Sequence, residues 1–170
     1  MKRTIVRTAL ATIFLATLHL CLAPAMRAQD DGGCSNATVA GKWGYTYVGT
    51  IILPTATGTV TVPVAAVGRF TLDRDGNLSG TQTRSNGGVS AQETITAKII
   101  VDADCTATGN FYVYDSGQLV RTATLALVFD DDSREARTMF ESLTLANGHT
   151  LPVVITVESR KISSAAATVT

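Results

Sequence analysis

The stretch Val101-Asp102-Ala103-Asp104-Cys105-Thr106 decides how the chain must fold. Its aspartates favour a tight turn, and Cys105 leaves that turn at the start of a new β-rich segment. Another cysteine, Cys34, lies far upstream. A fold that lets these two cysteines meet must bring the segment around Cys34 to the end of the molecule that carries this turn.

Residues 1–28 have the features of a secretory signal peptide. Basic residues at the start are followed by an apolar run over 9–23, and small residues offer cleavage sites after Ala25 or Ala28. A membrane anchor is the alternative, but the run is shorter than the roughly 20 residues that cross a bilayer. We therefore expect a secreted or periplasmic protein.

Removal of this leader leaves an acidic chain. The whole chain holds 14 Lys and Arg and 14 Asp and Glu residues, and four of the basic ones lie in the leader, which leaves 10 against 14, a net charge of −4. Such a surface repels phosphate backbones, so no nucleic-acid partner is expected. No membrane contact is expected after cleavage either.

The chain after the leader keeps two cysteines, Cys34 and Cys105. An exported protein meets an oxidising compartment, so one disulfide between them is expected. Closing such a loop is worth roughly 4 kcal/mol in the chain-entropy model. The alternatives are two free thiols or a bond between two molecules.

From Lys42 onward the chain is rich in β-branched and aromatic residues, with Gly, Asn and Asp at the breaks. Short turns between strands require antiparallel neighbours. The pattern predicts eight strands, at 42–53, 59–72, 78–85, 89–101, 105–114, 118–129, 134–145 and 150–161.

Eight such strands in succession would leave two costly edges in an open sheet, and closing the sheet removes them. We therefore predict an all-β fold, an antiparallel up-and-down eight-stranded barrel over 42–161. Its interior is filled by side chains or holds one small ligand. A two-sheet β-sandwich is the alternative. Residues 162–170 are expected to form a flexible tail.

Alternate turns of such a meander lie at the same end of the barrel. The turns at 73–77, 102–104 and 130–133 therefore share the end at which the first strand starts. Cys105 lies just past one of these turns, and Cys34 lies in the segment that leads into the same end. Segment 29–41 is thus predicted to plug that end, and any mouth lies at the opposite end.

The start of the first strand, Gly41-Lys42-Trp43, resembles the glycine-x-tryptophan signature of lipocalins and other calycins. In those barrels the tryptophan closes the plugged end, often under a basic residue from the end of the last strand. The resemblance assigns that part to Arg160.

A second set of motifs covers nearly the whole chain after the leader. These motifs are Cys34-Ser35-Asn36, Ala40-Gly41, Val67-Gly68-Arg69-Phe70-Thr71, Asp75-Gly76-Asn77-Leu78-Ser79-Gly80 and Asp104-Cys105-Thr106. They are similar to those of a group of small exported bacterial proteins with an allene oxide cyclase-like barrel. Ala107 and Thr108 depart from the glycine-threonine pair of that group. The resemblance implies a fold more than an activity.

No motif predicts a catalytic centre, a metal site or a cofactor. His149, the one histidine after the leader, lies beside Gly148 and is expected to be solvated. No serine or cysteine has recognisable partners for a nucleophilic triad. Seven aspartates gather at the plugged end and could hold calcium, but aspartate also favours hairpin turns, which is the interpretation we prefer. They are Asp73, Asp75, Asp102, Asp104, Asp130, Asp131 and Asp132.

The densest aromatic residues are the candidates for a ligand site. Rings that point inward would line an apolar pocket, and ordinary core packing is the alternative. The candidates are Trp43, Tyr45, Tyr47, Tyr112 and Tyr114.

Three charged residues, Glu93, Arg137 and Glu141, lie within predicted strands. An inward carboxylate in an apolar barrel would have a raised pKa and could act as a general acid or base. Facing outward, the same residues would form cross-strand ion pairs. The sequence pattern leaves both directions open.

Three functions fit these observations. We favour a non-enzymatic exported barrel that binds a small, mostly apolar ligand. The alternatives are an isomerase or cyclase of the allene oxide cyclase kind, which needs an inward Glu or Arg, and a structural or protein-interaction domain with a filled core.

Overall fold

The computed structural model describes residues 33–130 and 132–162. The predicted signal peptide (1–28), the first part of the plug segment, Asp131 and the tail from 163 onward lie outside the described residues. No helix within the described ranges is long and apolar enough to cross a membrane.

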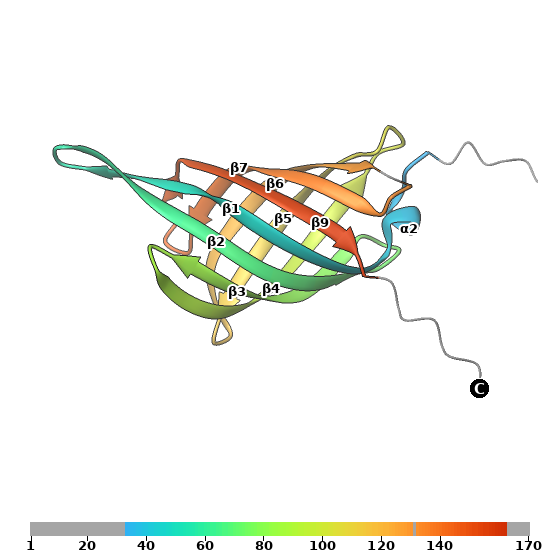
Figure 1. Ribbon diagram of the computed structural model, residues 1–170, viewed down its shortest axis with the longest axis horizontal. Helices are drawn as coiled ribbons and strands as arrows, with labels where there is room; N and C mark the ends of the chain where they lie inside the picture. Colours follow the sequence, from blue (N-terminus) through green and yellow to red (C-terminus); the bar gives the residue numbers. More distant parts are fainter. Residues whose placement is uncertain (1–32, 131, 163–170) are drawn as a thin grey trace, which may run out of the picture. The chain divides into compact units, whose positions relative to one another are not determined.

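The described residues form one short helix and a set of β-strands, shown in Figure 1. The helix is α2 (Asn36–Val39). The strands are β1 (Gly41–Thr55), β2 (Gly58–Leu72), β3 (Asn77–Asn86), β4 (Val89–Val101), β5 (Thr106–Asp115), β6 (Gln118–Asp130), β7 (Glu135–Leu145), β8 (Thr150–Leu151) and β9 (Val153–Lys161).

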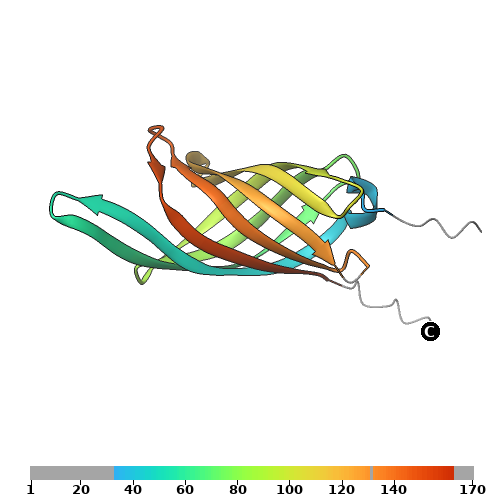
Figure 2. The ribbon, with the colours of Figure 1, turned by 90° about the horizontal axis from the view of Figure 1, so that it is seen from above.

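These strands form one closed barrel (Figures 1 and 2). Strands β1 to β7 pair in succession, and β9 pairs with both β7 and β1, so the sheet closes on itself. The predicted eight-stranded up-and-down barrel is confirmed, and the β-sandwich alternative is wrong. The predicted eighth strand consists of β8 and β9, separated at Pro152, which has no N–H to donate to the sheet.

The described part of the plug segment lies at one end of the barrel, where Figure 1 shows α2. Ser35 caps α2 in a capping box with Thr38, and Val39 is fully buried. The predicted disulfide is present, with a Cα–Cα distance of 4.7 Å between Cys34 and Cys105. The backbone N–H of Cys34 also donates to the carbonyl of Ala103 at 3.2 Å. The acidic turn is therefore joined to the segment before α2 by a disulfide and a backbone hydrogen bond.

At the opposite end the hairpin of β1 and β2 projects beyond the other strands (Figure 2). The pairing of β1 with β9 ends at Ile51, and that of β2 with β3 begins at Val64. Single further bonds join Ile52 to Pro152 and Gly87 to Pro63. Residues 53–62, here called the overhang, therefore continue as a ribbon in which β1 and β2 pair with each other.

Candidate functional site

The plugged end of the barrel is tightly filled around Trp43, which is fully buried. Its indole Nε1 donates to the carbonyl of Val39 at 3.1 Å. The ring stacks on Phe70 at 6.0 Å and meets Phe129 edge-on at 5.8 Å between centroids. Trp43 therefore helps to close the plugged end of the barrel and does not line an open ligand site.

A basic residue does cover Trp43, but it is Lys161 instead of the predicted Arg160. Lys161 Nζ lies 5.6 Å from the ring centroid and donates to the carbonyl of Thr38 at 2.8 Å. The register explains the error, because Lys161 pairs opposite Trp43, whereas Arg160 pairs opposite Gly44 and faces outward. Arg160 binds Glu135 on the outer surface.

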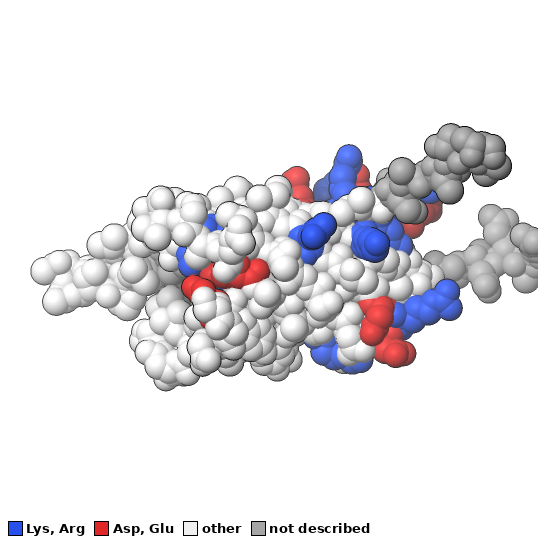
Figure 3. Space-filling view, turned by 90° about the horizontal axis from the view of Figure 1, so that it is seen from below, with Lys and Arg blue, Asp and Glu red and all other residues white. Residues whose placement is uncertain are grey.

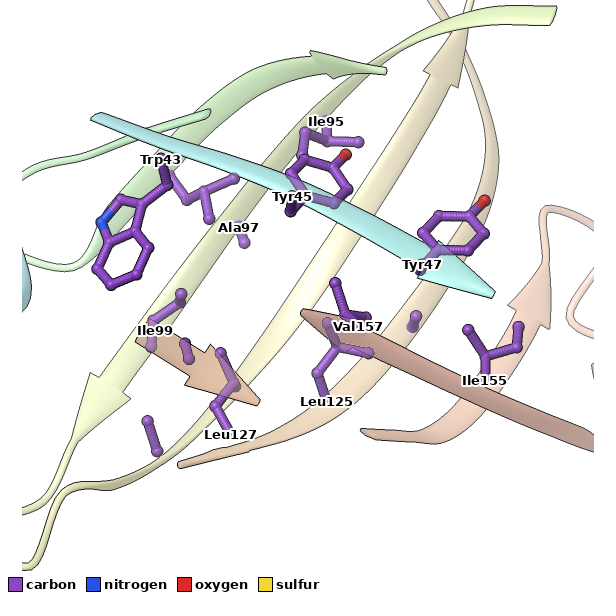
Figure 4. Packing of buried hydrophobic residues seen from close by; sticks show 14 of the residues in the cluster. Trp43, Tyr45, Tyr47, Ile95, Ala97, Ile99, Leu125, Leu127, Ile155 and Val157 are labelled. Atoms are coloured by element: carbon purple, nitrogen blue, oxygen red, sulfur yellow. The ribbon is translucent and has the colours of Figure 1, made fainter. Parts of the chain in front are cut away.

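The interior next to the plugged end is packed with apolar side chains. Figure 4 shows Trp43, Tyr45 and Tyr47 along β1 beside residues such as Leu125 and Leu127. The cavity among these side chains measures about 70 Å³, which has room for a few water molecules rather than for an organic ligand. This half of the barrel fits the filled-core expectation.

A larger cavity, here called the mouth pocket, lies at the open end of the barrel. Its volume is about 350 Å³, within the usual range for small-molecule sites. Leu53 and Val62 of the overhang contribute to its wall. The complete lining is Tyr47, Ile51, Leu53, Val62, Val64, Arg84, Asn86, Val120, Arg121, Phe140, Leu143, Leu145, Leu151 and Ile155.

A buried polar cluster lies between the packed interior and the mouth pocket. We call it the Glu93 cluster, and its members are Tyr45, Gln82, Arg84, Glu93 and Arg121. Gln82 on β3 pairs opposite Glu93 on β4, and Arg84 follows on the same face of β3. Arg121 reaches the cluster from β6.

Hydrogen bonds connect all members of the Glu93 cluster. Arg121 binds the carboxylate through two nitrogens at 2.8 and 2.5 Å, and Arg84 Nε donates to it at 2.9 Å. Gln82 Nε2 donates to Glu93 at 2.6 Å, while Tyr45 Oη donates to Gln82 Oε1 at 2.7 Å. Such a connected network holds its side chains in one arrangement.

The cluster carries one net positive charge at neutral pH. Burial opposes the ionisation of Glu93, but hydrogen bonds from Arg121, Arg84 and Gln82 outweigh it and hold the pKa of this carboxyl at about 2. Burial also raises the pKa of Tyr45 and of Tyr47, so both phenols stay neutral. Two guanidinium cations therefore face one carboxylate.

The three charged strand residues point in different directions. Glu93 faces inward and is ionised, so the expectation of a raised pKa for an inward carboxylate is wrong here, because two arginines compensate the burial. Arg137 and Glu141 are exposed on the outer face of β7. Arg137 Nε lies 3.5 Å from an Asp130 carboxylate oxygen.

Two of the five aromatic candidates lie on the outer face. Tyr112 is 39% exposed, and Tyr114 pairs opposite the exposed Thr94. Their neighbours Phe111 and Val113 face inward instead and line the 70 Å³ cavity. The prediction that Tyr112 and Tyr114 line an internal pocket is therefore wrong, while Tyr45 and Tyr47 do face the interior.

Two of the aspartates, Asp73 and Asp104, stabilise the turns that contain them. Asp73 Oδ1 accepts from the backbone N–H groups of Asp75 and Asn77, and Asp104 Oδ1 accepts from the N–H and hydroxyl of Thr106. Across residues 33–130 and 132–162, no group of three or more His, Cys, Asp or Glu side chains is arranged to hold a metal ion. His149 is exposed in the turn before β8.

Gly68 gives the Tyr45 ring the space it needs inside the barrel. A Cβ on Gly68 would lie 2.6 Å from Tyr45 Cζ and Oη and 2.7 Å from the Thr81 carbonyl oxygen. We expect Gly68→Ala to lower the free energy of unfolding by about 1–3 kcal/mol, because the ring or the backbone must shift. Urea unfolding followed by tryptophan fluorescence measures this effect.

Gly44→Ala on the same sheet is the matched control. Its Cβ would meet Ile162 at an ordinary 3.6 Å, so a change below about 0.5 kcal/mol is expected. Equal effects of the two substitutions would contradict the steric argument.

Comparisons with known proteins give a structural similarity but no family assignment. No protein-family profile matches the sequence, and no curated protein sequence matches it. Among solved structures, the chain is similar to a redesigned β-barrel, mFAP1, bound to DFHBI. The TM-score is 0.47 and the identity 14%, over 74% of this chain and 97% of that chain.

The class defined by the fold is a small closed β-barrel with an internal disulfide. The lipocalin and allene oxide cyclase resemblances stay predictions, since none of the comparisons assigns the chain to a family.

Proposed function

We propose that this protein is an exported barrel that binds a small, mostly apolar ligand in the mouth pocket. The observation that carries the proposal is the volume of about 350 Å³ at the open end, beside an interior that is otherwise filled. Most of the lining side chains are aliphatic or aromatic, with a few polar groups at one side, as is typical of ligand sites. The leader-like residues 1–28 and the disulfide support export.

The isomerase or cyclase alternative has one observation in its favour, the inward Glu93. An ionised carboxylate with a pKa of about 2 is a weak general base, because its affinity for a proton is low. Binding without chemistry is therefore the function that the mouth pocket supports best.

Filling the mouth pocket tests the proposal. Purified protein is titrated with N-phenyl-1-naphthylamine, a neutral apolar probe whose fluorescence rises on leaving water. We expect Val120→Trp, which occupies the pocket, to weaken probe binding by about tenfold or more.

The matched control is Val128→Trp on the same strand, where the native side chain is 52% exposed on the outer face. This variant is expected to bind the probe like the unmodified protein, and circular dichroism verifies that both variants form the barrel. Absence of probe binding to the unmodified protein, or equal binding by both variants, would overturn the proposed function.

A further inference from the structure

The floor of the mouth pocket carries a positive charge that the protein itself leaves unbalanced. Arg84 and Arg121 both line the pocket, with side chains 17% and 13% exposed, and both bind Glu93, whose side chain is 1% exposed. No Asp or Glu is among the described residues that line the pocket. Since a largely buried charge without a partner is unfavourable, one bound anion would balance the excess positive charge and stabilise the site.

Arg84 has the donors to hold such an anion. Arg121 donates hydrogen bonds to the Glu93 carboxylate through both Nη1 and Nη2, whereas Arg84 donates to it only through Nε. In the hydrogen bonds between described residues, both terminal nitrogens of Arg84 remain unused. A guanidinium binds a carboxylate through two parallel hydrogen bonds, so this free edge suits a second carboxylate.

A second polar atom marks the same side of the pocket. Asn86 lies two residues beyond Arg84 on β3, and its Oδ1 is buried without a hydrogen-bond partner among the described residues. A buried acceptor is satisfied by a donor such as water, and an ionised carboxylate has no hydrogen to donate to it. Asn86 therefore marks a polar position beside Arg84 but does not itself hold an acid group.

The remaining lining has the opposite character. Residues 43–68 contain no Lys, Arg, Asp or Glu, and Figure 3 shows that the projecting end of the molecule is free of charged side chains on the face in view. Apolar side chains from this stretch, among them Ile51, Leu53 and Val62, form the wall above the charged floor. The pocket is thus apolar toward the overhang and cationic at its base.

We propose that the ligand is an apolar monocarboxylate, with its acid group on Arg84 and its hydrocarbon part against the wall formed by the overhang. This inference rests on the proposed function and specifies its ligand class. One negative charge on the ligand balances the one net positive charge of the Glu93 cluster. The net charge of −4 expected after removal of residues 1–28 does not oppose this, because residues 43–68, which supply the wall, contain no charged side chain.

The test compares two ligands that differ in the acid group. Octanoate and octanol are used at neutral pH to displace N-phenyl-1-naphthylamine from the unmodified protein. Octanoate is expected to displace the probe at a concentration about tenfold lower than octanol, although its charged group costs more to remove from water. Equal displacement, or a preference for octanol, overturns the inference.

Substitution of Arg84 then identifies the group responsible. In Arg84→Gln the preference for octanoate over octanol, measured as the ratio of the two displacing concentrations, is expected to disappear. Arg137→Gln is the matched control, because it removes the same charge from the exposed face of β7, and it should keep the preference. Retention of the preference in Arg84→Gln assigns the effect to another group and overturns the role of Arg84.

The two proposals fail in different ways. If the neutral probe binds and octanoate has no advantage, the binding function stands and the acid-specific inference is wrong. If the probe does not bind at all, both are wrong. Should Arg84→Gln fail to form the barrel, the octanoate and octanol comparison on the unmodified protein still decides the ligand class, and Arg84→Lys, which keeps the charge, is expected to retain part of the preference.

Discussion

Replacement of Glu93 by Gln is expected to lower the free energy of unfolding by about 3 kcal/mol. The substitution keeps the size of the side chain but leaves Arg84 and Arg121 largely buried without their shared carboxylate. Urea unfolding at neutral pH, followed by the fluorescence of the single tryptophan, measures the change. Glu141→Gln on the outer face of β7 is the control, with an expected change below about 0.5 kcal/mol.

The same carboxylate makes stability depend on pH in a defined direction. The pKa of Glu93 is about 2 in the folded protein, against an ordinary value of 4.5. A depressed pKa stabilises the fold above the ordinary value, and this contribution, about 3 kcal/mol, is lost as the pH falls through the folded value. Between pH 4.5 and 2 the unmodified protein should therefore lose that much more stability than Glu93→Gln. Parallel pH profiles for the two proteins would contradict this account of the cluster.

Loss of the disulfide is expected to have the largest effect on stability, about 4 kcal/mol. The bond joins cysteines separated by 71 residues, and cutting it frees that loop in the unfolded chain. The double variant Cys34→Ser with Cys105→Ser is compared with the unmodified protein by urea unfolding. The variant should also show a red-shifted tryptophan emission, since α2 is then held at Trp43 only by noncovalent contacts.

A reductant provides the control for the disulfide. Reduced unmodified protein should unfold like the double variant, and the double variant itself should be insensitive to reductant. A double variant as stable as the oxidised protein would show that the bond contributes nothing beyond the packing of the plug.

The alternation of apolar and polar residues along the strands and the Gly, Asn and Asp residues between them were sufficient to predict the barrel. Most predicted strands had one apolar face, and the turns at 73–77 and 102–104 placed both cysteines at one end, where the disulfide lies. The overhang was not foreseen, although the predicted strands 42–53 and 59–72 are close to the observed β1 and β2. Strand lengths alone do not show that pairing with β9 ends at Ile51 and pairing with β3 begins only at Val64.

The candidate site was predicted less well, for physical reasons that differ between strands. In β5 both faces carry large side chains, so alternation alone does not decide whether Phe111 and Val113 or Tyr112 and Tyr114 face inward. The position of Arg121 depends on an irregular register between β5 and β6 at Val113 and Tyr114.

Gln82 and Arg84 could have been found from the sequence. They lie at even spacing from Leu78, so they share the strand face of this residue, which is buried in the barrel. No role was predicted for the polar residues on this face. In comparable barrels, a polar residue on the strand face that points inward indicates a candidate for a buried polar site.

The pairing of β1 with β9 has a consequence for the order of folding. The other neighbours in the sheet are close in sequence and can form hairpins quickly, whereas this pair joins strands from the two ends of the barrel. Bringing such distant segments together has a higher entropic cost than closing a hairpin. The sheet therefore stays an open meander, with both edges unprotected, until β9 has been synthesised and reaches β1. The barrel therefore cannot close around an incomplete sequence, because β9 supplies the strand that joins β7 to β1.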